Sequence, residues 1–232
     1  MKDMVIPISL GAVNAFLLKG ERSVLVDTGY PRNAAKILNG LSANGVNPED
    51  VSLIIITHSH HDHSGSVLEL RERTGAKVAV HRLDAEALRL GVDTDLRPYG
   101  IKGRFARMFS SEKRKAEGIE ADIIIEDEMN LEEFGIKGKV ISTPGHTSGS
   151  ISIILDSGEA IVSDLIMGKF VIRGSPAYPF YASDISELRK SIRKIMVLGP
   201  KKVYASHGGP FYPEDILRSF RDDLGSNIEE AS

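Results

Sequence analysis

Apolar residues recur with two different periods along the first third of the chain. One period is typical of strands and the other of helices, so the two kinds of element can be told apart. Positions 5, 6, 8 and 10, then residues 15–18 and 23–26, form strand-like runs that end at a turn signal, Asp27-Thr28-Gly29. We expect a helix over about 32–44, because its apolar residues share one face and Gly45 follows it. Residues 53–56 are apolar on both faces, which predicts a buried central strand, followed by a helix to about 74 and a strand over 77–80.

The second half of the chain repeats this kind of organisation. Strand patterns occur at 123–125, 139–142, 150–155, 160–162 and 202–205. A helix is predicted over about 184–198, where Asp184 and Glu187 have capping-box spacing, and a final helix begins near Pro213. Residues 82–120 are helix-leaning and basic, and no linker-like boundary appears. We therefore expect one domain over 1–232 with a helical, basic insertion at about 82–120.

The most unusual stretch is THSHHDHSG at 57–65, which holds four of the seven histidines and an aspartate. It follows the expected central strand, where rigid strands present loop side chains to ligands. Imidazole is a common metal ligand, and a nearby carboxylate adds charge. A plain surface loop is the weaker interpretation, because crowded imidazoles repel one another once they are protonated. The cluster therefore predicts a metal site.

Three further candidates each follow an expected strand, as ligands of one site should. A catalytic zinc needs about three protein ligands plus water. His146 comes after 139–142, Asp164 after 160–162 and His207 after 202–205. Taken singly, an aspartate at a strand end is more often a cap, and a histidine beside glycine is often a turn residue. Together with the cluster they indicate metal ligands.

Composition removes several alternatives. The chain has no cysteine, which excludes disulfides, thiolate zinc sites and cysteine nucleophiles. Its net charge of −3 gives no general case for nucleic acid or an anionic membrane. Apolar runs are far shorter than the ~20 residues that span a bilayer. The first residues lack a charged region followed by an unbroken apolar stretch, so we expect a cytoplasmic protein.

The motifs together resemble a known family. THSHHDHSG, TPGHTSGS, the aspartate of VSDLIM and the histidine of ASHGG are similar, in that order, to the metallo-β-lactamase-fold hydrolase superfamily, with the glyoxalase II-like branch nearest. VDTG at 26–29 resembles the early turn of that family, and the likeness covers about 5–215. The resemblance implies an α/β fold, a four-layer αββα sandwich of two mixed β-sheets flanked by helices, with a two-metal site at one edge.

The resemblance also implies a role for each candidate. His58, His60 and His146 would hold a first metal, and Asp62, His63 and His207 would hold a second, with Asp164 bridging both. Asp27 would lie behind the ligands and hold the cluster loop in place. His61 matches no ligand position and is interpreted as a residue that either lies beside the ligands or faces solvent. His81 matches no ligand position and is interpreted as an ordinary residue. Ser163 stands where family members often carry glycine.

This set of residues predicts two divalent cations, with zinc expected and iron or manganese open. Such a pair lowers the pKa of a shared water toward ~7, so that a hydroxide can attack an ester-like bond. Asp62 would orient that nucleophile and relay its proton. Thioester, lactone, β-lactam and phosphodiester substrates all stay open.

Two other functions also stay open. Persulfide dioxygenases of this fold resemble the subset His58, His146 and Asp164, which would hold one iron that acts with oxygen on a glutathione persulfide-type substrate. A non-catalytic, metal-stabilised binding protein is the other alternative, and the complete set of seven candidates argues against it.

Two segments are candidates for recognising a small-molecule substrate. Residues 97–115 carry seven basic side chains, for which a solvated helix face is favoured over a lid that gathers an anionic substrate. The segment 168–183 is rich in Phe, Tyr, Pro and Gly and could line a pocket or simply anchor its own loop. The contacts expected from it are Lys169, Arg173, Tyr178, Phe180 and Tyr181. Nucleic acid and membrane partners are not expected, and a homodimer stays open.

Overall fold

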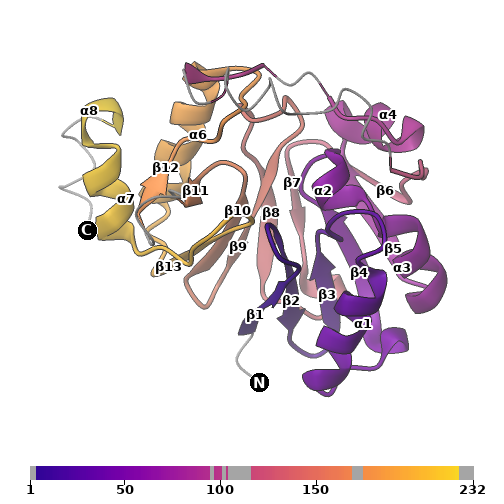
Figure 1. The fold of residues 1–232 in the computed structure, drawn as a ribbon. Helices are drawn as coiled ribbons and strands as arrows, with labels where there is room; N and C mark the ends of the chain where they lie inside the picture. Colours follow the sequence, from indigo (N-terminus) through magenta and orange to yellow (C-terminus); the bar gives the residue numbers. More distant parts are fainter. Residues whose placement is uncertain (1–3, 95–96, 101–102, 104–115, 169–174, 225–232) are drawn as a thin grey trace.

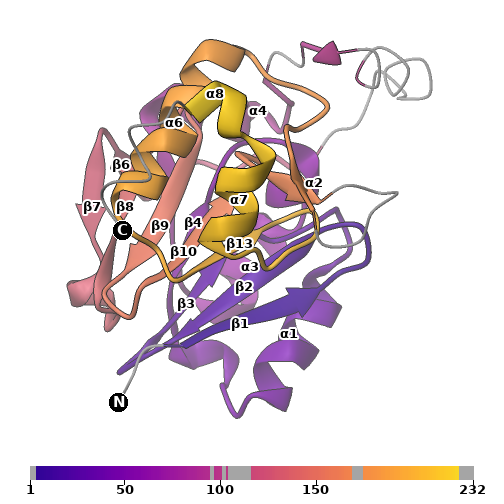
Figure 2. The same ribbon diagram turned by 90° about the vertical axis from the view of Figure 1, so that its left-hand side faces the viewer.

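The protein is a sandwich of two β-sheets with helices on both outer sides (Figure 1). The computed structural model describes residues 4–94, 97–100, 103, 116–168 and 175–224. Figure 2, turned by 90°, shows the helices of the second half packed outside one sheet and those of the first half outside the other. The predicted four-layer αββα architecture is confirmed.

The first sheet is mixed and has the order β1-β2-β3-β4-β5-β6. The first three strands form an antiparallel meander, and the remaining pairings are parallel. Parallel neighbours bring their carboxyl ends to one edge, and the loops there carry the histidine cluster. The strands are β1 (Met4–Ser9), β2 (Asn14–Lys19), β3 (Ser23–Val26), β4 (Val51–Ile56), β5 (Lys77–His81) and β6 (Ile123–Ile125).

The second sheet has the order β13-β10-β9-β8-β7. Its strands are antiparallel neighbours except for β10 and β13, which run parallel. These strands are β7 (Glu128–Asn130), β8 (Gly138–Ser142), β9 (Ile151–Leu155), β10 (Glu159–Ser163) and β13 (Lys202–Ala205). A small antiparallel pair, β11 (Met167–Gly168) and β12 (Pro176–Ala177), lies beyond the sheet.

Helices cover the outer face of each sheet. On the first sheet lie α1 (Ala34–Ala43), α3 (Val67–Thr74) and α4 (Arg82–Leu90), and on the second lie α6 (Ile185–Val197), α7 (Pro213–Ser219) and α8 (Arg221–Leu224). Short turns complete the described elements: α2 (His61–Ser64) and the 3₁₀ turns η1 (Pro48–Asp50) and η2 (Glu132–Phe134). None of the described helices is long and apolar enough to cross a membrane.

Three apolar clusters hold the four layers together, one at each interface between layers. Strand β4 explains why residues 53–56 are apolar on both faces, because both faces of this strand are buried. Leu53 and Ile55 pack between the two sheets, whereas Ile54 and Ile56 pack against the outer helices. Successive strand residues point to opposite faces, so a central strand of a sandwich buries both sets.

Most of the expected elements are present, with shifts at their ends. Gly45 follows α1 with a φ of +67°, and Asp184 caps α6 by accepting hydrogen bonds from the backbone N–H groups of Ser186 and Glu187. The helix expected after Gly65 is preceded by the turn α2, which lies inside the histidine cluster. The very short strands β7, β11 and β12 were not predicted. Of the predicted helical insertion, residues 82–90 are α4, and 95–96, 101–102 and 104–115 lie outside the described residues.

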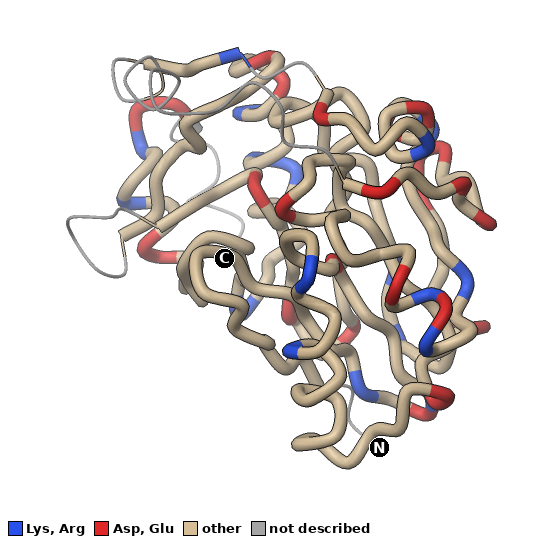
Figure 3. Tube along the Cα trace, turned by 45° about the vertical axis from the view of Figure 1, so that its right-hand side comes forward, with Lys and Arg blue, Asp and Glu red and all other residues tan. Residues whose placement is uncertain are grey.

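Positively and negatively charged residues are interspersed along the described part of the chain (Figure 3). This distribution accords with the small net charge of −3. The prediction that nucleic acid is not a partner stays a prediction.

Candidate metal centre

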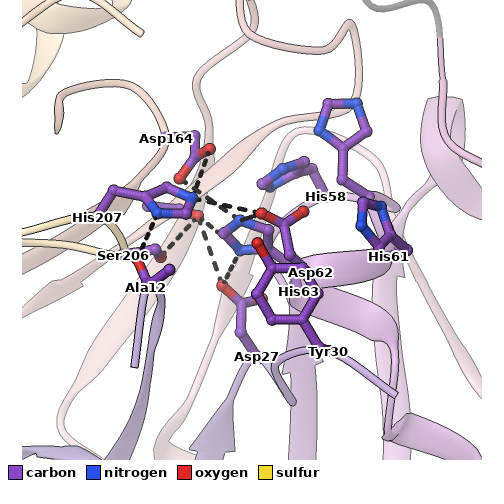
Figure 4. A network of polar contacts seen from close by, with 12 residues as sticks. Ala12, Asp27, Tyr30, His58, His61, Asp62, His63, Asp164, Ser206 and His207 are labelled. Atoms are coloured by element: carbon purple, nitrogen blue, oxygen red, sulfur yellow. Dashed lines mark hydrogen bonds and ion pairs between the residues drawn. The ribbon is translucent and has the colours of Figure 1, made fainter. Parts of the chain in front are cut away.

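The dispersed histidines and aspartates of the sequence converge at one point between the ends of the two sheets (Figure 4). Among the described residues, three groups of three side chains have their ligand atoms within 4.8 Å of one another, and two of these groups share no residue. One is the His58 group, which contains His58, His60 and His146. The other is the His63 group, which contains Asp62, His63 and His207. These are the same two sets that the family resemblance implied for a first and a second metal.

Asp164 lies between the two groups. Its Oδ1 is 3.5 Å from Nε2 of His63, and its Oδ2 is 3.6 Å from Nε2 of His146 and 3.5 Å from Nε2 of His207. On the other side, Asp62 Oδ2 lies 3.4 Å from Nε2 of His207. The carboxylate of Asp164 therefore has the position that a bridging ligand would need.

Every histidine of the two groups has one ring nitrogen held from outside the cluster. The nitrogens and their partners are His58 Nδ1 with Thr57 Oγ1 at 3.2 Å, His60 Nε2 with Thr94 Oγ1 at 3.3 Å, His63 Nδ1 with Asp27 Oδ2 at 2.9 Å, His146 Nδ1 with the Tyr181 carbonyl at 2.8 Å, and His207 Nδ1 with the Ala12 carbonyl at 2.7 Å. Such contacts fix which nitrogen faces a metal. The other nitrogen of each ring is left for the interior of the cluster.

Several of these inward atoms have no hydrogen-bond partner among the described residues. They are Nε2 of His58, Nε2 of His63 and Oδ1 of Asp164, and all three are buried. A buried polar atom without a partner costs about 1–3 kcal/mol, so such atoms rarely gather without a reason. Nitrogen and oxygen donors that converge in this way fit divalent cations such as zinc, iron or manganese.

The His58 group is kept neutral by its surroundings. Burial, and then the neighbouring imidazoles His63, His60 and His146, hold the pKa of His58 well below its usual value. Burial and the adjacent His146 lower the pKa of His60 to about 3. Burial also lowers the pKa of His146. Neutral imidazole is the form that binds metal, so this group needs to lose no proton before it binds a cation.

The His63 group has the opposite electrostatics. Burial alone would lower the pKa of His63, but Asp164, Asp62 and Asp27 raise it to about 10. Asp164 and Asp62 likewise raise the pKa of His207 well above its usual value against the effect of burial. These two imidazoles in turn keep the pKa of Asp62 and of Asp164 below the usual range, against the opposing effect of burial. Without metal, this group therefore holds protons that a cation would displace.

Asp27 lies behind the cluster loop, as the resemblance implied. It is fully buried, with a φ of 61°, and its carboxylate accepts hydrogen bonds from the backbone N–H and the hydroxyl of Thr57 and from Nδ1 of His63. Ser163 also has a positive φ, 47°, and its Oγ lies 2.8 Å from Thr57 Oγ1 and 3.1 Å from Ser206 Oγ. The serine hydroxyl thus adds a polar link between the two sheets that glycine could not make.

The remaining two histidines have distinct environments. His61 lies at the edge of the cluster, where Asp93 accepts hydrogen bonds from its backbone N–H and from Nδ1, and its ring meets Tyr30 edge-on at 5.4 Å. His81 caps α4, since its Nδ1 accepts a hydrogen bond from the Leu83 N–H.

Sequence reasoning missed three polar residues that contact the cluster loops. Asp93 holds His61, and Thr94 contacts His60. Asp84 is fully buried and accepts hydrogen bonds from Ser59 and from the loop that carries His146. The one available signal was position: Asp84 follows β5 closely, at the same edge of the sheet as the histidines.

The predicted substrate contacts are distributed differently. Lys169 and Arg173 lie outside the described residues. The hydroxyl of Tyr178 donates to Asp223, on α8, which places this ring against the helices. The backbone carbonyl of Phe180 accepts from the Tyr99 N–H, and that of Tyr181 accepts from His146. A role of these five residues in substrate binding stays a prediction.

Comparison with known proteins places this arrangement in a family. The profile of the metallo-beta-lactamase superfamily matches residues 8–207, which include all six residues of the two groups and Asp164 between them. The chain is similar to "Probable metallo-hydrolase YflN" of Bacillus subtilis, with 28% identity over 87% of this chain and 79% of that protein.

Two further proteins are similar to this chain. The chain also matches a hydroxyacylglutathione hydrolase of Shewanella pealeana over a shorter stretch. That match is 28% identical and covers 44% of this chain and 28% of the hydrolase, and it agrees with the glyoxalase II-like resemblance. The crystal structure of TTHA1623 in a di-iron-bound form is 25% identical, with a TM-score of 0.67 over 92% of this chain and 98% of that one. The chain therefore belongs to the metallo-beta-lactamase superfamily of metal-dependent hydrolases.

Proposed function

We propose that this protein hydrolyses an ester-like bond in a small molecule, using two divalent cations held by the His58 group and the His63 group. One observation carries the proposal: two groups of three inward-facing donors lie on either side of the Asp164 carboxylate, and both groups are complete. A single-metal site would need only one of them.

A pair of bound divalent cations supplies an activated water near neutral pH and polarises the bond to be cleaved. The protein supplies the positions. Five imidazoles held by outer hydrogen bonds keep their inner nitrogens fixed, so that little reorganisation is needed when the site is loaded.

Asp62 is the residue that we assign to proton transfer. His63 and the hydrogen bond from His207 keep its pKa low, so it is an ionised acceptor at neutral pH. Its side chain is 17% exposed, whereas that of His63 is fully buried, so Asp62 faces the accessible side of the cluster. From there it can orient a water molecule and accept its proton.

Zinc is the proposed metal, and iron is the main competitor. The donor set of imidazole nitrogens and carboxylate oxygens suits both metals. The similarity to the di-iron form of TTHA1623 favours a direct test of iron. We further propose that the protein acts in the cytoplasm, and the similarity to a hydroxyacylglutathione hydrolase makes thioesters the first substrates to test, before lactones and phosphodiesters.

Elemental analysis and a substrate screen test the proposal together. Protein purified without added metal should contain close to two metal ions per chain and should cleave at least one thioester, lactone or phosphodiester substrate. The variant Asp164→Ala serves as the background, because it should fold and have no activity. One iron per chain with oxygen uptake on glutathione persulfide would replace the hydrolase by the dioxygenase, and two metals with no turnover in either assay would favour a binding protein.

A further inference from the structure

Asp84 is a buried carboxylate outside the two metal groups, at the first turn of α4. Its Oδ2 accepts hydrogen bonds from the Ser59 N–H at 2.8 Å and from Thr147 Oγ1 at 3.1 Å. Its Oδ1 accepts from the Gly149 N–H at 3.2 Å. Ser59 lies between His58 and His60, and Thr147 directly follows His146. One carboxylate thus joins the two loops that supply the three histidines of the His58 group.

We infer that Asp84 is a positioning residue that sets the geometry of the His58 group and leaves the His63 group unaffected. The inference rests on the two-metal function proposed above. It assigns Asp84 no contact with metal or substrate: its effect is exerted through the backbone of Ser59 and through the loop at 147–149.

The surroundings of Asp84 indicate a fixed acceptor rather than a salt-bridge partner. The ion pairs found among the described residues include none to Asp84, and the side chain is fully buried. Burial raises the pKa of Asp84, and the hydrogen bonds from Ser59, Thr147 and Gly149 oppose that rise. A buried carboxylate that accepts several hydrogen bonds is positioned tightly, because moving it would leave both it and its donors unpaired.

The loop that follows His146 is fitted closely to this carboxylate. A Cβ atom at Gly149 would collide with Oδ1 and Cγ of Asp84. Glycine therefore permits the backbone approach that brings the Gly149 N–H onto the carboxylate. A side chain at position 149 would push the loop at 147–149 away from Asp84, although it would remove no hydrogen-bonding group.

Asp27 provides the counterpart on the other side of the centre. It holds Nδ1 of His63 and the N–H of Thr57, whereas the three donors to Asp84 all belong to the segments around the His58 group. Asp27 holds the His63 ring directly and reaches the His58 group only through Thr57, whose hydroxyl lies 3.2 Å from Nδ1 of His58. The contacts of Asp84, by contrast, are confined to the segments of the His58 group, so its loss should weaken that metal position selectively.

The variant Asp84→Asn tests the inference with almost no change of shape. Its amide has one acceptor oxygen and one NH₂ group, so at least one of the N–H groups of Ser59 and Gly149 must face another donor. Metal titration against a chromophoric chelator should show one tight site retained and the other weakened about 10–100-fold. Asp27→Asn should weaken the site of the His63 group more than that of the His58 group, because Asp27 holds the His63 ring directly, and the double variant should retain neither tight site. Anomalous diffraction should locate the ion that remains in each single variant.

The control is Asp122→Asn, which changes a carboxylate that accepts from the Val78 N–H in the same sheet, far from the centre, and should keep both sites tight. The inference would be overturned if Asp84→Asn still bound two metals tightly, or if it weakened both sites equally. It would also be overturned if Asp122→Asn lost as much metal affinity as Asp84→Asn does. Each of these results would leave the proposed function standing. A wild-type protein that does not bind two metals would overturn both.

If Asp84→Asn does not fold, Thr147 gives a second test. Thr147→Val removes one donor to the carboxylate and should weaken the same single site, whereas Thr147→Ser keeps the hydroxyl and should restore it. Tight binding of both metals by Thr147→Val would then count against the role of Asp84.

Discussion

His60 and His146 are 86 residues apart in sequence, yet Nδ1 of His60 lies 3.1 Å from Nε2 of His146. Since Nδ1 of His146 donates to the Tyr181 carbonyl, its Nε2 is the acceptor and His60 Nδ1 carries the proton. Nε2 of His60 then accepts from the Thr94 hydroxyl. To bind a metal through Nδ1, His60 must move its proton to Nε2, and the Thr94 hydroxyl must turn to accept it.

Thr94 should therefore matter to both tautomers of His60. We predict that Thr94→Val weakens metal binding by the His58 group roughly tenfold, because Nε2 of His60 loses its partner in either tautomer. Thr94→Ser keeps the hydroxyl and should bind as the wild type does. Metal titration of the two variants checks this, and equal affinities for Val and Ser would show that the 3.3 Å contact does not orient the ring.

The opposite pKa shifts of the two groups predict that they fill with metal at different pH. His60, with a pKa of about 3, and its neighbours are neutral throughout the physiological range, whereas His63, with a pKa of about 10, holds a proton. A cation must displace that proton, so affinity at the His63 group should rise roughly tenfold per pH unit for each proton displaced. Titrations at several pH values should show one pH-sensitive site and one nearly insensitive site.

The same shifts set how the stability of the metal-free protein depends on pH. The raised pKa of His63 contributes stability that is fully present below the unfolded value of 6.5 and is lost as pH rises through about 10. The lowered pKa of His60 removes stability as pH falls from 6.5 toward about 3, since only the unfolded chain takes up that proton. The melting temperature of the metal-free protein should therefore fall toward both low and high pH. The melting temperature of the metal-loaded protein should depend less on pH.

Much of the fold could be predicted because its strands and helices have clear periods. The double-sided apolar run of β4 and the one-sided faces of α1 and α6 are properties of local sequence. Strands β11 and β12 have two residues each, too few for any period to show. The turn α2 was hidden because its sequence, HDHS, contains candidate metal ligands and shows no helical pattern of apolar residues.

The candidate ligands could be predicted for a different reason. Each follows a strand, and strand ends of a mixed sandwich meet at a common edge. Asp93 and Thr94 gave no such signal, and Asp84, although it closely follows β5, lies in the first turn of a helix, where a polar residue is ordinarily solvated. Their partners lie 25 to 65 residues away for Asp84, 32 away for Asp93 and 34 away for Thr94, so only the folded structure brings them together.

The layer between the two sheets should be needed for stability and not for chemistry. Phe16 is 1% exposed there and meets the ring of Tyr204 edge-on at 5.9 Å. Phe16→Ala should lower the free energy of unfolding by about 3–5 kcal/mol, because it removes buried apolar contacts and leaves a cavity. Denaturant unfolding measures this, with Met4→Ala, at a position 51% exposed, as a control expected to change little. Metal content per folded chain should stay at the wild-type value in both variants.

Tyr178 could either contact the substrate or anchor its own loop to the core, and a substitution distinguishes these two roles. Its hydroxyl donates to Asp223 at 2.8 Å, its ring packs against Phe220, and the guanidinium of Arg189 lies 5.6 Å from its centre. These contacts favour the anchor, so Tyr178→Phe should lower the free energy of unfolding by about 1 kcal/mol and leave KM unchanged. Tyr212→Phe, at a half-exposed position, should change neither quantity. A several-fold rise in KM with unaltered stability would instead place the Tyr178 hydroxyl on the substrate.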